Sequence, residues 1–315
     1  MLKRILAGLI AICALFLAAC AGGSSSSADS ESVTFTDALG RSVTVPKSPQ
    51  RVAALIGSFA DVWMLAGGEV CATADDAWDD FGLDLPADTV NLGATKNPNL
   101  ELLFAADPDF VIASASTAKN VEWLDVLERA GITVAYFDVS NFADYLQMLN
   151  VCTDITGRKD LYEQNGICLR AQIDAMKSDF EATTGEDKTK VLFLRASAGY
   201  IRAKNSQGSI LGEMLADLGC VNIADSDASL LENLSVESII RQDPDCIFVV
   251  QVGDDAEAVK RNLEQMMREN PVWAELTAVK ENRLYYMEKR LFNLKPNARW
   301  AEAYEKLINI LQTAG

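Results

Sequence analysis

Histidine is absent from this chain of 315 residues. Histidine is the commonest metal ligand and the side chain most often used as a general base, so its absence argues against a bare zinc site and against a histidine-dependent hydrolase. There is also no C-x-x-C pair, the other usual zinc-binding arrangement. Direct ligation of a transition metal would have to use carboxylates, tyrosine or thiol. We therefore predict no metal site and no resident cofactor.

Positive charge is scarce, with 28 Lys and Arg against 45 Asp and Glu and a formal net charge of −17. Binding to nucleic acid needs a basic stripe, so nucleic acid is excluded as a partner. The chain also lacks a G-x-S-x-G elbow, a G-x-x-x-x-G-K-[ST] phosphate loop and a spaced glycosidase carboxylate pair. These absences favour a binding protein. The alternatives are a secreted α/β enzyme and a tethered adhesion or scaffold module.

The longest apolar run is too short to span a membrane. Residues 5–19 follow the basic head Lys3-Arg4 and fall below the roughly 20 residues that a spanning helix needs, as in a secretory signal. The run ends in Leu17-Ala18-Ala19-Cys20, which resembles a bacterial lipobox. We expect residues 1–19 to be a lipoprotein signal peptide and Cys20 to carry the lipid. An uncleaved anchor or a plain signal peptide with a chance cysteine is the alternative.

The serine-rich stretch that follows cannot bury enough apolar surface to fold. We therefore expect residues 20–32 to form the lipidated cysteine and a flexible tether. The folded part would then hang from the cell membrane by a lipid anchor, on the extracytoplasmic face.

Five cysteines remain in the folded part, an odd number with no close pair, and a domain of this size does not need disulfides. We expect buried free thiols at Cys71, Cys152, Cys168, Cys220 and Cys246.

Strand-like and helix-like segments alternate along the chain. Residues 33–46, VTFTDALGRSVTVP, predict a β-hairpin because apolar and polar residues alternate on both sides of a glycine-containing turn. Apolar strands are expected at 51–55, 89–93, 109–114 and 133–138, and in a second set at 190–197, 246–250 and 283–288. Helices are expected at 58–66, 120–131, 209–220 and 298–311. Such alternation predicts βαβ units and a mostly parallel sheet.

The stretch between the two sets has residues that recur at three- to four-residue steps, as one face of a helix would, namely Leu161, Cys168 or Leu169, Gln172 or Ile173, Met176 and Phe180. This spacing predicts one long helix. We therefore expect an α/β fold of two Rossmann-like lobes, 33–155 and 186–315, joined by a single bridging helix over 156–185.

A short phrase occurs once in each set, as LELLFAADPD at 100–109 and VESIIRQDPD at 236–245. Asn99 and Ser235 can cap a helix, and the helix dipole favours Glu101 and Glu237 in the first turn. The residue before a proline is pushed out of the α region, so Asp-Pro ends each helix. Helix capping alone would explain each copy.

Five motifs follow one another along the chain: TDALGRSVTVP, RVAAL, NLELLFAADPDFVIAS, LSVESIIRQDPDCIFVV and NPVWAELTAVKENRLYYM. This succession resembles the periplasmic binding proteins that feed ABC importers for ferric siderophores, haem and vitamin B12. The resemblance covers residues 33–311 and implies the class III periplasmic-binding-protein fold, with a ligand cleft between the lobes. It also implies that Glu101 and Glu237 dock on the two permease subunits of an importer with its ATPase, and that the protein is a monomer.

In such a fold the cleft is lined by loops at the carboxyl ends of strands. The candidates in the first lobe are Ser58, Phe59, Trp78 and Phe81 with their segment 77–81, Lys96, Asn97, Ser114 and Ser116; those in the second are Arg195, Tyr200, Arg202, Lys204, Arg290, Phe292 and Lys295. The cations suggest an anionic ligand and the aromatics flat apolar walls. Each could instead be a solvated charge or a core aromatic.

The ligand that these residues fit best is a small-molecule metal chelate of the ferric siderophore type, which brings its own coordination sphere. Haem is an alternative, with Tyr200 or another tyrosine as axial ligand. A cobamide is a further alternative, since aromatic walls would suit its edge.

Overall fold

The computed structural model describes residues 31–183, 188–253 and 255–314. The predicted signal peptide, Cys20 and most of the tether lie outside the described residues, as does the end of the predicted bridging helix. Among the described residues, no helix is both long enough and apolar enough to cross a membrane.

The predicted β-hairpin is confirmed. Strands β1 (Ser32–Thr36) and β2 (Ser42–Pro46) pair antiparallel, and Val43 and Val45 bury their side chains while their neighbours in β2 stay exposed. The carboxylate of Asp37 closes the turn by accepting hydrogen bonds from the backbone N–H groups of Leu39 and Arg41, each at 3.0 Å.

The first lobe holds a five-stranded sheet in the order β5-β4-β3-β6-β7, with every pair parallel. Its strands are β3 (Val52–Ala54), β4 (Val70–Thr73), β5 (Val90–Asn91), β6 (Phe110–Ser114) and β7 (Thr133–Phe137). Its helices are α1 (Gly57–Leu65), α2 (Asp76–Asp79), α3 (Leu100–Ala105), α4 (Ala118–Glu122), α5 (Leu124–Arg129) and α6 (Phe142–Thr156). The single helix predicted over 120–131 is wrong: two helices meet at the buried Trp123, whose N–H bonds to the Asn120 carbonyl and tightens the turn.

The second lobe holds parallel strands in the order β10-β8-β11-β12, with β9 added antiparallel to β8. Its strands are β8 (Lys190–Ala196), β9 (Ile201–Ala203), β10 (Val221–Asn222), β11 (Cys246–Gln251) and β12 (Leu284–Met287). Its α-helices are α9 (Ile210–Asp217), α10 (Ala228–Asn233), α11 (Val236–Gln242), α12 (Ala256–Glu269), α13 (Thr277–Lys280), α14 (Lys289–Phe292) and α15 (Trp300–Ala314). Three 3-10 turns, η2 (Ile223–Asp225), η3 (Pro271–Glu275) and η4 (Asn297–Arg299), lie between them.

A nearly continuous helical segment separates the two sheets in sequence. It consists of α7 (Lys159–Tyr162), a π-helical turn η1 (Glu163–Ile167) and α8 (Cys168–Thr183). Ile173 and Phe180 are buried along α8, whereas Cys168 is exposed. The π turn contains Gly166, where a Cβ atom would approach the Leu146 side chain of α6 to 3.1 Å, so the glycine permits close packing there.

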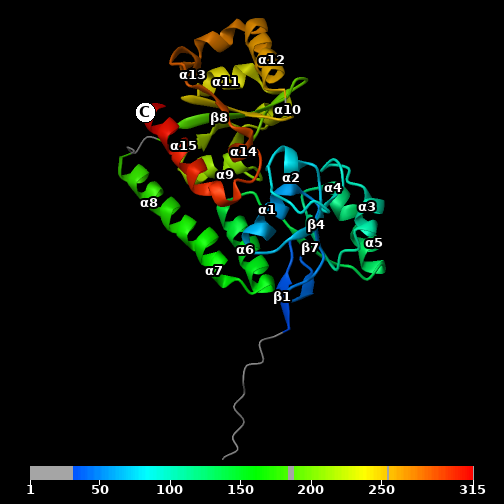
Figure 1. Cartoon of the computed structure of the whole chain (residues 1–315). Coiled ribbons are helices and arrows are strands. Elements are labelled where there is room, and N and C mark those ends of the chain that lie inside the picture. Colours follow the sequence, from blue (N-terminus) through cyan, green and yellow to red (C-terminus); the bar gives the residue numbers. More distant parts are fainter. Residues whose placement is uncertain (1–30, 184–187, 254, 315) are drawn as a thin grey trace, which may run out of the picture. The chain divides into compact units, whose positions relative to one another are not determined.

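The largest apolar core joins elements of both lobes. It contains residues of α1 and α6 from the first lobe together with α9 and α15 from the second, and the rings of Phe142 and Trp300 meet within it at 5.7 Å. Helix α15 runs beside α8 (Figure 1). Smaller cores line the other face of each sheet. The lobes are therefore packed against each other through a shared core and not only through the connecting helix.

All five cysteines of the folded part are free. Cys152 and Cys246 are buried and Cys71 and Cys220 are partly buried, as expected for inert thiols. The prediction of a buried thiol is wrong at Cys168, which lies on the solvent side of α8.

Candidate ligand-binding site

A cavity of about 860 Å³ lies between the two sheets. Its walls come from the carboxyl ends of strands β3, β4, β5 and β6 in the first lobe and β8, β11 and β12 in the second, and from the segments that follow them. The carboxyl ends of parallel strands are where open α/β sheets bind ligands, because the connecting loops leave a crevice there. A volume of this size falls in the range of small-molecule sites, about 300–1,000 Å³.

Several of the residues predicted to bind ligand line this cavity. They are Ser58, Phe81, Lys96, Ser114 and Ser116 from the first lobe and Arg195 and Lys295 from the second. Their roles in binding remain predictions, but the structure brings them to one cavity from loops far apart in the sequence.

The charges that line the cavity are arranged by lobe. Among the described lining residues, the carboxylates are Asp75, Asp76, Asp79 and Asp80 from the stretch around α2, and the cations are Lys96, Arg195, Lys289 and Lys295. Lys289 forms an ion pair with Asp80 across the cavity, at 2.6 Å. The first-lobe wall is thus mainly acidic and the second-lobe wall basic.

The carboxylate of Asp76 is fixed by the close approach of two helices. It accepts a hydrogen bond from the Gly57 N–H at 2.8 Å, and burial raises its pKa. A Cβ atom on Gly57 would lie 2.5 Å from the Ala77 nitrogen, so only glycine lets α1 and α2 start this close together. The sequence offered segment 77–81 as a candidate, but it did not reveal the role of Asp75 and Asp76.

Lys295 and Arg195 reach the cavity without a carboxylate partner. Among the described residues neither forms an ion pair, and the Lys295 ammonium lies over the ring of Phe59 at 5.7 Å from its centroid. Burial lowers the pKa of Lys295, against the opposing effect of Asp138 and Asp76. Nη2 of Arg195 donates to the side-chain oxygen of Asn293 at 3.2 Å. Both cations are therefore available to a bound anion.

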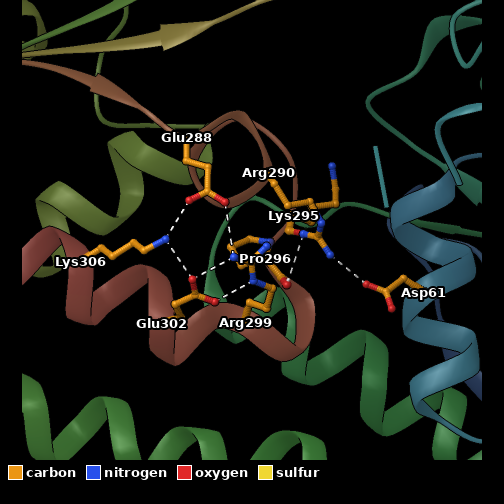
Figure 2. Close-up of polar contacts among 8 residues, drawn as sticks. All are labelled: Asp61, Glu288, Arg290, Lys295, Pro296, Arg299, Glu302 and Lys306. Atoms are coloured by element: carbon orange, nitrogen blue, oxygen red, sulfur yellow. Dashed lines mark hydrogen bonds and ion pairs between the residues drawn. The ribbon is translucent and has the colours of Figure 1, made fainter. Parts of the chain in front are cut away.

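Arg290 lies beside the cavity but does not line it. Its guanidinium forms an ion pair with Asp61 of α1 at 3.2 Å, lies over the ring of Phe81 at 4.0 Å, and donates to the Lys295 carbonyl at 2.6 Å. Figure 2 shows this group bridging α1 and the segment that carries Lys295. Asn297 donates to the same Asp61 carboxylate at 2.8 Å. Arg290 thus holds the backbone of Lys295 in place.

Other candidates from the sequence are not among the described residues that line the large cavity. Phe59 is fully buried beneath Lys295, and Trp78 is not among the lining residues. The loop expected to bring Tyr200, Arg202 and Lys204 into the cleft instead forms the hairpin of β8 and β9, and the Arg202 guanidinium lies over the exposed Tyr200 ring at 5.3 Å.

Three more residues complete the second-lobe wall. Phe292 was predicted from the sequence, whereas Lys289 and Asn293 were not. Phe292 is buried and lines a smaller cavity that adjoins the large one. Lys289 and Asn293 line the large cavity from α14 and the residue that follows it. Lys289 stands directly before the predicted Arg290, so the basic pair Lys289-Arg290 was the available signal. The short helix α14 turns Lys289 to the cavity and Arg290 to α1.

The duplicated phrase has the same structure in both lobes. The predicted caps are confirmed: Asn99 accepts hydrogen bonds from the N–H groups of the first turn of α3, and Ser235 accepts one from Ser238 in α11. Each helix ends before an aspartate in the left-handed region, with φ of 49° at Asp107 and 42° at Asp243.

The two glutamates of the phrase are exposed. Glu101 and Glu237 lie in the first turns of α3 and α11, and among the described residues neither carboxylate has an ion-pair partner. Exposed apolar side chains accompany them, Leu102 and Phe104 beside Glu101 and Ile240 beside Glu237. Each lobe therefore presents one free carboxylate on a partly apolar surface.

The comparison with protein families decides the class of the molecule. The family described as "Periplasmic binding protein" matches residues 52–291. The chain belongs to this family. Its members are extracytoplasmic substrate-binding proteins of ABC importers and not enzymes, which confirms the expectation that this chain is not an enzyme.

Relatives within the periplasmic binding protein family bind different ligands. The "Fe(3+)-citrate-binding protein YfmC" of Bacillus subtilis is 27% identical over 291 residues, which cover 88% of this chain and 88% of the relative. The crystal structure of S. aureus IsdE complexed with heme has a TM-score of 0.68 at 16% identity, covering 82% of this chain and 98% of that chain. The vitamin B12 binding protein BtuF of Vibrio cholerae has a TM-score of 0.68 at 17% identity, covering 85% and 99%. The two structures confirm the predicted fold class.

Proposed function

We propose that this periplasmic binding protein captures a ferric chelate in the cavity between its sheets and delivers it to the permease dimer of an ABC importer. The observation that carries the proposal is the cavity of about 860 Å³ with Lys96, Arg195 and Lys295 in its walls and no carboxylate paired to them among the described residues. Cations without a carboxylate partner favour an anionic ligand. YfmC, a relative named for ferric citrate, supports this ligand class.

The composition of the cavity favours a chelate over haem. Protein ligands of haem iron are His, Cys, Met or Tyr, and none of these residue types is among the described residues that line the large cavity. Tyr200, the axial ligand considered for haem, is exposed on the hairpin of β8 and β9. A ferric chelate needs no such ligand because it carries its own coordination sphere. Phe81 is the one aromatic side chain among these lining residues, which leaves few flat walls for a cobamide.

The exposed glutamates are proposed as the docking contacts. A permease made of two similar subunits offers the same contact twice, and Glu101 and Glu237 offer matching carboxylates on the two lobes. Arginine on the permease would pair with them in a fork geometry.

The membrane anchor is proposed from the sequence around Cys20. A thioether-linked lipid on Cys20 would keep the protein at the extracytoplasmic face, and the acidic body would stay clear of anionic lipid. Cys20→Ala should release the protein from the membrane or leave the uncleaved precursor, as seen by fractionation and immunoblotting. Retention of a mature-sized protein in the membrane fraction would contradict the anchor.

Titration of the purified protein with a panel of ligands tests the proposed ligand class. We expect ferric citrate or another ferric chelate to quench tryptophan fluorescence saturably, and haem and cobalamin to cause no saturable change. A saturable Soret shift with haem, or tight binding of cobalamin alone, would contradict the proposal.

A further inference from the structure

A smaller cavity of about 150 Å³ adjoins the large one. The two share four lining residues, Ser116, Arg195, Asn293 and Lys295, so they are compartments of one site. The smaller compartment falls below the volume range of whole small-molecule sites, about 300–1,000 Å³. It is too small for a chelate and large enough for one functional group of a ligand.

The two compartments differ in charge. Among the described residues that line the large cavity, carboxylates and cations are equal in number. Around the small one the charged residues are Arg195, Lys295 and the single carboxylate Asp138. Asp138 is exposed, whereas the two cations are partly buried, so solvent screens the carboxylate more effectively. The small compartment is therefore net positive.

Among the described residues, the two cations that line the small compartment have no carboxylate partner. Among the described residues, the Nε of Arg195 and the Oγ of Ser209 have no hydrogen-bond partner, and neighbouring protein atoms cover both of them. The Lys295 ammonium lies over the Phe59 ring and has no ion pair. A cation without a carboxylate partner favours the binding of an anion at this position.

The first turn of α9 faces the same compartment. Gly208, Ser209 and Ile210 line it, and Ser209 occupies the N-cap position without a capping hydrogen bond from its side chain. The Glu213 carboxylate accepts a hydrogen bond from the Gly208 N–H at 3.0 Å, so this N–H is not available to a ligand. The positive end of the helix dipole adds to the two cations.

We propose that this small compartment, the carboxylate pocket, binds one free carboxylate arm of the metal chelate through Arg195 and Lys295, while the body of the chelate fills the large cavity. The inference rests on the proposed function and narrows it. It assigns the protein to chelates of the hydroxycarboxylate type, which carry such an arm. Ferric trihydroxamates without a carboxylate have no group for the pocket.

The test compares two probes on matched variants. Dissociation constants for ferric citrate and for a ferric trihydroxamate without carboxylates are measured by fluorescence on the wild type and on the Arg195→Gln and Lys295→Gln variants. Loss of a charge-assisted hydrogen bond should weaken ferric citrate binding by about tenfold or more. Binding of the trihydroxamate should change by less than about twofold or be absent throughout. Thermal unfolding of each variant shows whether it is folded.

Lys96→Gln is the matched control, because Lys96 lines the large cavity and not the small one. The Lys96→Gln substitution should change the dissociation constants for ferric citrate and for the trihydroxamate by similar factors. Equal losses for both probes in Arg195→Gln and Lys295→Gln, or an unchanged affinity for ferric citrate, would overturn the carboxylate pocket. Wild-type binding of the trihydroxamate without ferric citrate would overturn it too, and would leave the carrier function standing. Failure to bind any ferric chelate would overturn both.

Discussion

Asp109 and Asp245 make equivalent hydrogen bonds to backbone N–H groups in the two lobes. The Asp109 carboxylate accepts hydrogen bonds from the backbone N–H groups of Gln50 and Arg51 at 2.8 and 3.1 Å, just before β3. The Asp245 carboxylate accepts from the N–H of Lys190 at 2.7 Å, at the start of β8. The last aspartate of each duplicated phrase therefore joins the start of the strand that follows it to the start of a neighbouring strand.

Replacing either aspartate with alanine should lower the free energy of unfolding. Asp109→Ala and Asp245→Ala each remove a charged acceptor from backbone donors, at a cost of about 1.5 kcal/mol. Chemical denaturation measures the effect, with Asp88→Ala in an exposed turn as the control. An unchanged midpoint for both variants would contradict the proposed bracing of the strands.

The pair of Asp61 and Arg290 should be strongly coupled. Both side chains are mostly buried, at 16% and 17% exposed, and burial raises the pKa of Asp61. Asp61→Asn and Arg290→Met each leave a partner unpaired and should cost about 3 kcal/mol, whereas the double variant should cost less than their sum. Denaturation of the four proteins of this cycle gives the coupling, and Lys280→Gln, on the surface, is the control. Strict additivity would mean that the ion pair does not hold the cleft segment.

Glu302 gives the protein a pH-dependent element at the start of α15. Hydrogen bonds from Arg299 and Lys306 lower its pKa to about 2, from 4.5 (Figure 2). Because the pKa in the folded state is below that of the unfolded chain, this stabilisation is present above pH 4.5 and is lost as the pH falls toward 2. Glu302→Gln should flatten the fall of unfolding temperature over that range, compared with the exposed neighbour Glu305→Gln. Identical pH profiles for the wild type and Glu302→Gln would contradict this assignment.

The thiols should react in the order of their exposure. A maleimide at neutral pH should label the exposed Cys168 of the folded protein first. Burial raises the pKa of Cys152 and raises that of Cys246 to about 11, so both should be labelled only after unfolding. Peptide mass spectrometry locates the label, and Cys168→Ser should remove the fast reaction. Labelling of native Cys152 at the rate of Cys168 would contradict the packing of α6.

Local pattern was enough to predict the fold because the strands are buried on both faces. The runs at 110–114 and 246–250 are continuous and apolar, as parallel strands require, and the hairpin of 33–46 alternates as a one-sided pair does. The first-turn glutamates, the helix caps and the Asp-Pro helix ends could also be predicted from local pattern. They act within a single helical turn.

The details of the site depend on contacts that no local pattern encodes. The segment RASAGYIRAK forms the hairpin of β8 and β9, in which Arg195 lines the cavity, whereas Tyr200 and Arg202 are not among the described residues that line it. Lys289, and not Arg290, lines the cavity because successive residues of the four-residue helix α14 point in different directions around its axis. Asp75 and Asp76 come to the site because Gly57 lets α2 approach α1.

Uptake by cells that depend on this protein tests its role as a carrier most directly. The initial rate of uptake of a radioactive ferric chelate is compared between the wild type and the Glu101→Ala/Glu237→Ala double variant. We predict that uptake falls to the level of cells without the protein, while the affinity of the purified double variant for the chelate stays within about twofold of wild type. Uptake at the wild-type rate by the double variant would contradict the account.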